Sequence, residues 1–289
     1  MGKPKKKLKI TSLHVIIAIG LVLLIFIMIY EGITGGPAAI QETLPEDTAQ
    51  ATEPPTTEPE PVFRTERQRA EYQIRKFAEE YGIHYTSYPD KIVDLLENNP
   101  ETEEFVKEYP LEYGHSYPAE MEQYANTDGV PLFLQWDRRW GYIIYGSDVA
   151  GLTGAGPMCL SMAGYYLTRD PAMSPDNMIA FALENGYSEY ATGSAWALIE
   201  EGAEKLGLQS TEIPLVRSQI KEYLQNGDVI ICAVGEGIFA ETSSYLVLTG
   251  WDDNGIRLND PNSKANSGKY WDYDELSGEI TNLWLIVKA

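Results

Sequence analysis

The chain has few of the side chains that most often carry proton transfer or bind metals. Its 289 residues include three histidines and two cysteines. Its 22 lysines and arginines are outnumbered by 43 aspartates and glutamates, and the formal net charge is −21. Nucleic-acid binding needs a basic patch, so we expect no nucleic-acid partner. Neither cysteine has a histidine near it in sequence, as a zinc site of that kind would require, and we expect no metal and no cofactor.

Both cysteines lie in apolar runs. Cys159 lies in GPMCLSM, and Cys232 lies in DVIICAVG. A free cysteine in such a run behaves as a small apolar side chain, so we predict that both are buried. A disulfide stays open as the alternative, because the domain is expected outside the cytoplasm.

One long segment near the N-terminus has no charged residue. It is Ile10–Tyr30, and the five lysines of the chain's first nine residues precede it. As a helix these 21 residues would span about 31 Å, roughly one hydrocarbon core. Lysines on that side only predict a cytoplasmic tail at 1–9 and an extracellular C-terminal domain. The alternative is a cleaved signal peptide, whose apolar region is normally shorter, about 7–15 residues.

Three further regions follow the predicted transmembrane helix. Residues 31–63 are rich in Pro, Thr and Glu and have almost no large apolar side chain, which predicts an extended stalk. Residues 64–127 are predicted to be a helical lead-in that docks on the main domain. Its helices are expected at 65–82 and after the Tyr88-Pro89 and Asn99-Pro100 steps. Residues 128–289 are predicted to be the main domain.

Helices are predicted before strands in the main domain. Helices are expected at 156–167, 176–185, 196–206 and 216–226, and strands at 130–135, 228–234, 245–251, 255–259 and 282–287. Asp253-Asn254-Gly255 is typical of a tight hairpin turn. A calcium loop at Asp252–Asn254 is disfavoured, because the spacing lacks the alternating ligands and final Glu of an EF-hand. The order of elements favours an α+β fold with an antiparallel sheet.

Four sequence blocks carry a family resemblance: VPLFLQWDRRWG from Val130, GSDVAGLTGAGPMCLSM from Gly146, SYLVLTGW from Ser244 and RLNDPNS from Arg257. Together they resemble the papain-like cysteine peptidases related to bacteriocin-processing, double-glycine leader peptidases. The resemblance runs from about residue 88 to residue 288 and includes the lead-in, which is similar to that of membrane-anchored or secreted relatives in Gram-positive bacteria. It implies a papain-like fold, with a central helix packed on an antiparallel sheet.

The resemblance also implies a four-residue site. Gln135 matches the glutamine that donates to the oxyanion, and Asp260 matches the carboxylate that orients the histidine. The nucleophile position of the G-C-G-P motif is Ala155, and the position of the basic histidine is Ser244. The nucleophile and the base are therefore both absent from the positions where the family has them.

We expect a membrane-anchored pseudopeptidase that binds a peptide or protein outside the cell without cleaving it. Two alternatives stay open. One is an active cysteine peptidase with a relocated dyad, for which Cys159 and His115 are the available residues. The other is a structural surface module without a functional cleft. An accessible hollow among Gln135, Ala155, Ser244 and Asp260 would favour the peptide-binding pseudopeptidase over the structural surface module.

Overall fold

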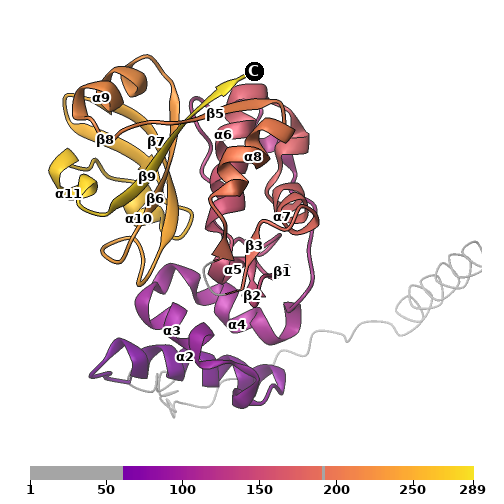
Figure 1. The fold of residues 1–289 in the computed structure, drawn as a ribbon. Coiled ribbons are helices and arrows are strands. Elements are labelled where there is room, and N and C mark those ends of the chain that lie inside the picture. The colour runs from indigo at the N-terminus through magenta and orange to yellow at the C-terminus, as the bar shows by residue number, and fades with distance from the viewer. Residues whose placement is uncertain (1–60, 191–192) are drawn as a thin grey trace, which may run out of the picture. The chain divides into compact units, whose positions relative to one another are not determined.

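The structure is a computed structural model that describes residues 61–190 and 193–289, and Pro61–Ala289 forms one compact unit. The predicted cytoplasmic tail, the predicted membrane helix at 10–30 and nearly all of the predicted stalk lie outside the described residues. Within the described ranges, no helix is both long and apolar enough to cross a membrane. The unit has a helical lead-in, a helical half and a sheet half (Figure 1).

The lead-in has the three predicted helices. Thr65 caps the first helix by accepting from the backbone N–H of Gln68 at 3.1 Å, and Gly82 ends it in the left-handed conformation with φ 67°. The Gln68 side chain accepts from the N–H of Arg64 rather than Thr65, so the capping box is offset by one residue. The helices are α2 (Glu66–Tyr81), α3 (Asp90–Asn98) and α4 (Glu103–Glu112), with short 3₁₀ turns at Tyr85–Ser87 and Pro100–Thr102.

The lead-in and the main domain share one hydrophobic cluster. Phe105 of α4 stacks on Tyr142, with ring centroids 4.6 Å apart. Phe105 also lies so close to Gly151 that a Cβ there would be 2.3 Å from the Phe105 ring. Val149 belongs to the same buried cluster. The lead-in is therefore part of the domain's core, as the predicted docking requires. The cluster has members on both sides of the boundary predicted at residue 128.

A helix buried on all sides forms the centre of the helical half. It is α6 (Ala155–Thr168), and every residue from Ala155 to Tyr165 is buried. Such a helix carries apolar or small side chains all round, as this one does. The helices predicted at 176–185 and 196–206 form within one residue of the predicted bounds, as α7 and α8. The other elements of this half are β1 (Ile144–Tyr145), β2 (Asp148–Val149), α5 (Ala150–Thr153), α7 (Pro175–Glu184), β3 (Ser188–Glu189), β4 (Gly193–Ser194) and α8 (Ala197–Lys205), with 3₁₀ turns at Met121–Tyr124 and Pro171–Met173.

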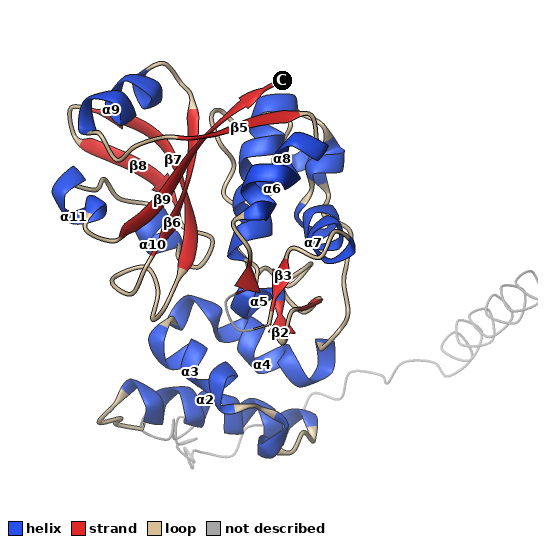
Figure 2. Cartoon of the chain, viewed as in Figure 1, coloured by secondary structure: helices blue, strands red, loops and turns tan. Residues whose placement is uncertain are grey.

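The sheet half contains five antiparallel strands in the order β5-β9-β6-β7-β8 (Figure 2). Asp253 and Asn254 form the predicted hairpin turn, in which the Asp252 carboxylate accepts from the Asn254 N–H at 2.8 Å. The α+β class is therefore confirmed. The elements are β5 (Leu208–Glu212), α9 (Arg217–Gln225), β6 (Val229–Val234), β7 (Ser244–Asp252), β8 (Gly255–Asn259), α10 (Lys264–Ser267), α11 (Tyr273–Ser277) and β9 (Ile280–Lys288).

Both faces of this sheet are buried. Side chains alternate between the faces of a strand. Ile231 and Val247 join the cluster around α6, whereas Leu246 and Leu248 join a second cluster with Ile220 of α9. The resulting order of layers is helix, sheet, helix, and the first interface contains the N-terminus of α6.

The strand predicted at 130–135 does not form. Pro131 has no N–H to donate to a ladder, and the Asn259 side chain donates to the carbonyls of Val130 and Pro131 at 3.2 and 2.9 Å. The segment forms no ladder and is held by these side-chain contacts and by the Gln135 N–H, which donates to Pro261. Strand β5 was not predicted, because only its first residue is buried and its sequence does not alternate.

Candidate functional site

Three of the four predicted site residues line one hollow. Gln135, Ala155 and Ser244 border a space of about 210 Å³ between the helical half and the sheet half, which we call the neck. Asp260 does not line the neck and is almost fully buried, but Asn262 of the same turn does line it. The structure therefore brings together positions that are more than a hundred residues apart in sequence.

Ala155 is the first residue of α6. Gly154 precedes it as the N-cap and offers no side-chain cap, so the first-turn N–H groups of α6 carry the positive end of a 14-residue helix dipole. A thiol at this position would have its pKa lowered by that dipole. A methyl group has no proton to lose and no lone pair, and Ala155 therefore offers no nucleophile.

Ser244 is the first residue of β7, and its backbone pairs with Val234 of β6. A serine acts as a nucleophile only when a base takes its proton. His84 and His115 are both exposed on the lead-in, and neither lines the neck. Among the described residues, no histidine or lysine lines the neck together with Ser244.

Gln135 is buried and fixed at both its backbone and its side chain. Its N–H donates to the carbonyl of Pro261 at 2.8 Å, which ties it to the Asp260 turn. Its side-chain Nε2 donates to the carbonyl of Gly151 at 3.1 Å, in the short helix α5 before Ala155. Gln135 thus links the Asp260 turn, through its backbone N–H, to α5, through its side-chain amide.

Asp260 organises its own turn. Its carboxylate accepts from the N–H of Asn262 and from the side chain of Asn266, each at 2.8 Å. Burial raises the pKa of Asp260 to about 6, and the two hydrogen bonds oppose that rise. The turn places Asn262, whose carbonyl accepts from the Trp136 indole at 2.8 Å. Asp260 therefore positions a wall of the neck.

The relocated dyad does not form. Cys159 is fully buried in the cluster around α6, whereas the His115 side chain is 64% exposed and lies 3.6 Å from Glu112. Burial raises the pKa of Cys159 well above its ordinary value and that of Cys232 to about 12. Both cysteines are free, as buried apolar residues, so the predicted burial is confirmed and the disulfide alternative is wrong.

The neck opens into a larger hollow on each side. It shares Ser194 and residues 242–245 with a hollow of about 590 Å³ that Trp196 borders, the Trp196 hollow. It shares Gln135, Asn262 and residues 239–241 with a hollow of about 500 Å³ bordered by α3, the lead-in hollow. The three hollows adjoin one another through these shared residues, and we call them together the groove.

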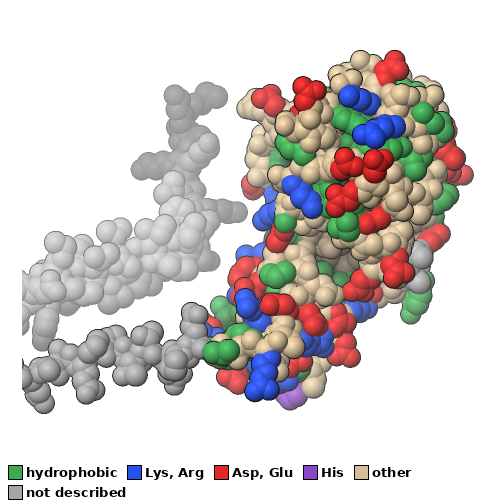
Figure 3. Space-filling view, turned by 90° about the vertical axis from the view of Figure 1, so that its left-hand side faces the viewer, with side chains coloured by type: hydrophobic (Ala, Val, Ile, Leu, Met, Phe, Trp, Pro, Cys, Tyr) green, Lys and Arg blue, Asp and Glu red, His purple; other side chains and the backbone are tan. Residues whose placement is uncertain are grey.

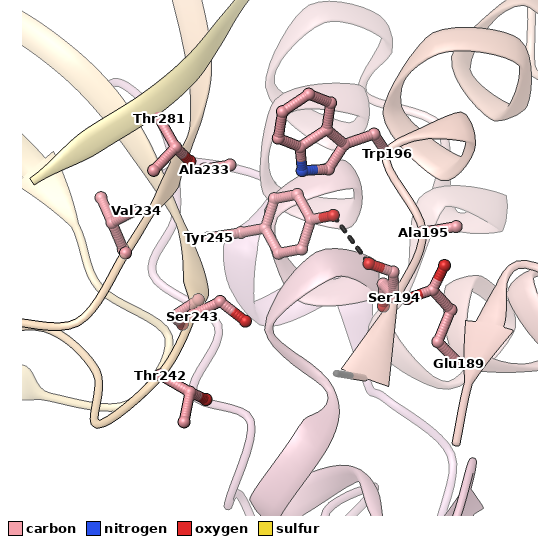
Figure 4. A pocket seen from close by; sticks show the side chains of 12 residues that line it. Glu189, Ser194, Ala195, Trp196, Ala233, Val234, Thr242, Ser243, Tyr245 and Thr281 are labelled. Carbon is pink, nitrogen blue, oxygen red and sulfur yellow. Dashed lines mark hydrogen bonds between the residues drawn. The ribbon is translucent and has the colours of Figure 1, made fainter. Parts of the chain in front are cut away.

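Tyr245 forms part of the groove wall in the Trp196 hollow. Its hydroxyl donates to the carbonyl of Ser194 at 2.8 Å, and the Ser194 hydroxyl lies 2.7 Å from that of Tyr145. Figure 4 shows the Tyr245 ring between Trp196 and Ser243, with its hydroxyl turned to Ser194. The phenol therefore fastens β7 to the segment before α8 and closes the groove floor, while the hollow above it stays open.

The loop 235–243 between β6 and β7 borders all three hollows. The Glu279 carboxylate accepts from the N–H of Ile238 at 2.9 Å and of Phe239 at 3.4 Å. The Asn98 side chain of α3 donates to Glu241 at 2.9 Å. The loop thus bridges the lead-in and the sheet, and both ends of the groove depend on it.

The loop, Ser194 and Trp196 were not among the predicted site residues. One signal existed for the loop. It joins two apolar strands through nine residues with two glycines, more than a tight hairpin needs, and long loops often carry function. No such signal marked Ser194, which is held at the groove by Tyr145 and Tyr245, or Trp196, which packs on Trp284.

In the part of the chain that the structure describes, no group of three or more His, Cys, Asp or Glu side chains lies close enough together to hold a metal ion. Both described histidines are exposed, and a histidine is visible at the lower edge of the face in Figure 3.

The comparisons with known proteins give one solved structure of interest. No protein-family model matches the chain, and no curated protein matches it. The peptidase domain of Streptococcus ComA, a bifunctional ABC transporter involved in a quorum-sensing pathway, is similar at 20% sequence identity and a TM-score of 0.37. The match covers 47% of this chain and 93% of that one. What this chain can do follows from its own groove residues.

Proposed function

We propose that this protein binds an extended peptide, or an extended segment of a protein, and does not cleave it. The observation that carries the proposal is the groove itself, three adjoining hollows with Ala155 and Ser244 on the middle one. Small-molecule sites commonly have volumes of about 300–1,000 Å³. The two larger hollows, of about 590 and 500 Å³, each fall in that range, and the neck between them lacks a nucleophile with a base.

The size of the chemical loss supports a binding role. Removing the nucleophile or the base of a peptidase typically costs about 10⁶-fold in turnover. Both are missing from the neck, and Cys159 lies buried beneath it. Residual stabilisation by Gln135 alone would leave peptide hydrolysis too slow to matter, so binding is the activity that the groove retains.

The sequence supports a location at the outer face of a cell membrane. The uncharged run at 10–30 follows a lysine-rich tail and precedes the acidic, proline-rich stretch at 31–63. The 26 residues 37–62 of that stretch would reach about 80 Å when extended. A non-catalytic binder acts by holding its ligand at a place, which suits a tethered domain better than a diffusing one.

The structural-module alternative predicts a filled cleft. Tyr245 fills only the floor, and neither Met158 nor the lead-in occupies the space beside Ala155. The neck has a volume of about 210 Å³ and continues into both hollows. The open groove favours a ligand-binding role over a purely structural one.

A selection experiment tests the proposal. The full-length chain in detergent is presented with a display library of random dodecapeptides, and enrichment is compared with that on a groove-blocked variant, Ser243→Trp. Ser243 is exposed and borders both the neck and the Trp196 hollow. We expect peptides that bind the native chain, bind the blocked variant at least tenfold less, and remain intact by mass spectrometry. Equal enrichment on both proteins would refute the proposal, as would cleavage of the bound peptides.

Ser116→Trp is the matched control. It adds the same indole at an exposed lead-in position that borders none of the three hollows. Its enrichment should equal that of the native chain.

A further inference from the structure

The groove is lined by side chains of mostly one charge. Lys91, Asp94, Glu189 and Glu241 are the charged residues that border its three hollows. Lys91, the one cation among them, forms an ion pair with Asp148. The remaining three are carboxylates on a chain whose formal net charge is −21. A hollow lined by one sign of charge attracts ligands of the other sign.

The acidic bias is concentrated at one end. Asp94 of α3 and Glu241 of the loop 235–243 both border the lead-in hollow, and so does Lys91, whose charge is balanced by Asp148. Asp94 is paired with Arg67, and Glu241 accepts from Asn98. Each carboxylate has about four lone-pair positions, so these contacts leave acceptor capacity on both. Asn262 also borders this hollow, and its buried Oδ1 has no hydrogen-bond partner among the described residues. The lead-in hollow is therefore rich in acceptors and suits a donor.

The other end has an apolar and aromatic wall, and Glu189 with several Ser and Thr residues also borders it. Trp196 is 48% exposed although it packs edge-on against Trp284, with centroids 5.6 Å apart. It borders the Trp196 hollow with Ala233 and Val234, and Figure 4 shows its indole facing into that hollow beside Tyr245. An exposed indole over an apolar wall suits an aromatic or aliphatic side chain of a ligand.

We infer that the groove's ligand is a peptide with net positive charge, with a lysine or arginine side chain in the lead-in hollow and an apolar side chain against Trp196. The inference rests on the proposed function and adds the class of ligand. It also excludes self-capture of the stalk, because every formally charged residue of 31–63 is acidic. Like charges in the groove and the stalk repel each other.

The library selection on the full-length chain also tests this inference. Peptides enriched on the native chain, and not on Ser243→Trp, should contain more Lys and Arg and fewer Asp and Glu than the starting pool. A synthetic peptide from the enriched set is then compared with its Lys/Arg→Glu counterpart by fluorescence polarisation. We expect the counterpart to bind at least tenfold more weakly, and the difference to shrink at 1 M salt, where the Debye length is about 3 Å.

Two double variants assign the preference to the lead-in hollow. Asp94→Asn with Glu241→Gln removes two charges there, and the new amide at position 241 keeps an acceptor for Asn98. We expect this protein to bind the basic peptide about fivefold more weakly. Glu122→Gln with Asp128→Asn removes the same charge from exposed positions that border no hollow, and should leave affinity unchanged.

The outcomes separate the two proposals. Groove-dependent peptides of unchanged or acidic composition would overturn the charge preference while leaving peptide binding intact. Equal loss in both double variants would overturn the role of the lead-in hollow. Absence of any groove-dependent peptide would overturn the proposed function itself.

Discussion

Ala155 and Ser244 begin two different elements, α6 and β7, and line the same hollow. The resemblance to papain-like peptidases predicts the nucleophile and the base at these two positions. Both residues line the neck, so side chains introduced at both positions would border the same hollow.

Restoring both side chains is therefore expected to restore a reactive thiol. In Ala155→Cys with Ser244→His, the new thiol lies at the N-terminus of α6 and faces an imidazole, and both lower its pKa. The rate of alkylation by iodoacetamide as a function of pH should give a thiol pKa below the ordinary value of about 8.5. Peptides found to bind the groove should then be hydrolysed.

Ala155→Cys alone is the control for that experiment. It has the helix dipole but no base, so its thiol should titrate higher than that of the double variant. Identical alkylation profiles for the two proteins would show that positions 155 and 244 do not meet closely enough for proton transfer.

The native cysteines should be inert. Cys159 and Cys232 are both completely buried, and burial raises the pKa of each thiol. The thiolate is the species that reacts, so an electrophilic peptide probe should label neither residue in the folded protein and both in guanidinium. Mass spectrometry of the intact protein gives the stoichiometry. One label per folded chain at Cys159 would support the relocated-dyad peptidase instead.

Much of the fold could be predicted because its signals are local. The hairpin at Asp253 and Asn254 needs only its turn residues and flanking strands, and α6 needs only its apolar run. The strand predicted at 130–135 was wrong because apolar content alone cannot supply a ladder partner. Its carbonyls bond to the side chain of Asn259, a contact across more than a hundred residues.

The site was predictable only in part, for a related reason. Gln135, Ala155, Ser244 and Asp260 could be named because motif blocks carry them. The groove around them depends on the loop 235–243, which is held by Glu279 41 residues further on and by Asn98 143 residues earlier. Nothing near the loop in the sequence marks these partners. The groove wall that this loop forms could therefore be recognised only in the structure.

Asp260 predicts an unusual dependence of stability on pH. Burial raises its pKa in the folded chain from the ordinary 3.8 to about 6. The folded chain therefore holds this proton more tightly than the unfolded chain, and the stability it contributes is present below about pH 4 and lost as pH rises through 6. Relative to the native chain, Asp260→Asn should gain about 2 kcal/mol of unfolding free energy between pH 4 and pH 7.

Urea unfolding at several pH values measures that difference. Asp128→Asn is the control, because Asp128 is exposed, and its difference from the native chain should stay flat. A flat difference for Asp260→Asn as well would mean that this carboxyl titrates as an ordinary one and is well solvated.

Glu101 predicts how firmly the lead-in is attached. Its carboxylate accepts from the N–H groups of Lys264 and Ala265 at 2.8 and 3.0 Å, so the lead-in caps the turn that follows Asp260. Glu101→Ala leaves both donors without that partner and should cost about 1–2 kcal/mol of unfolding free energy. Glu101→Gln keeps one acceptor and should cost less. Glu104→Ala, which removes only a local pair with Lys107, should cost under about 0.5 kcal/mol.

Hydrogen exchange locates the effect of Glu101. The amides of residues 264 and 265 should exchange faster in Glu101→Ala than in Glu104→Ala, because only the first variant removes their acceptor. Peptide affinity should fall with it, since the same turn carries Asn262 into both the neck and the lead-in hollow. Loss of stability without faster exchange at these two amides would mean that Glu101 acts elsewhere in the lead-in. The link between the lead-in and the groove would then rest on other contacts, such as the Asn98 side chain on Glu241 and the Asn99 side chain on the Asn262 carbonyl.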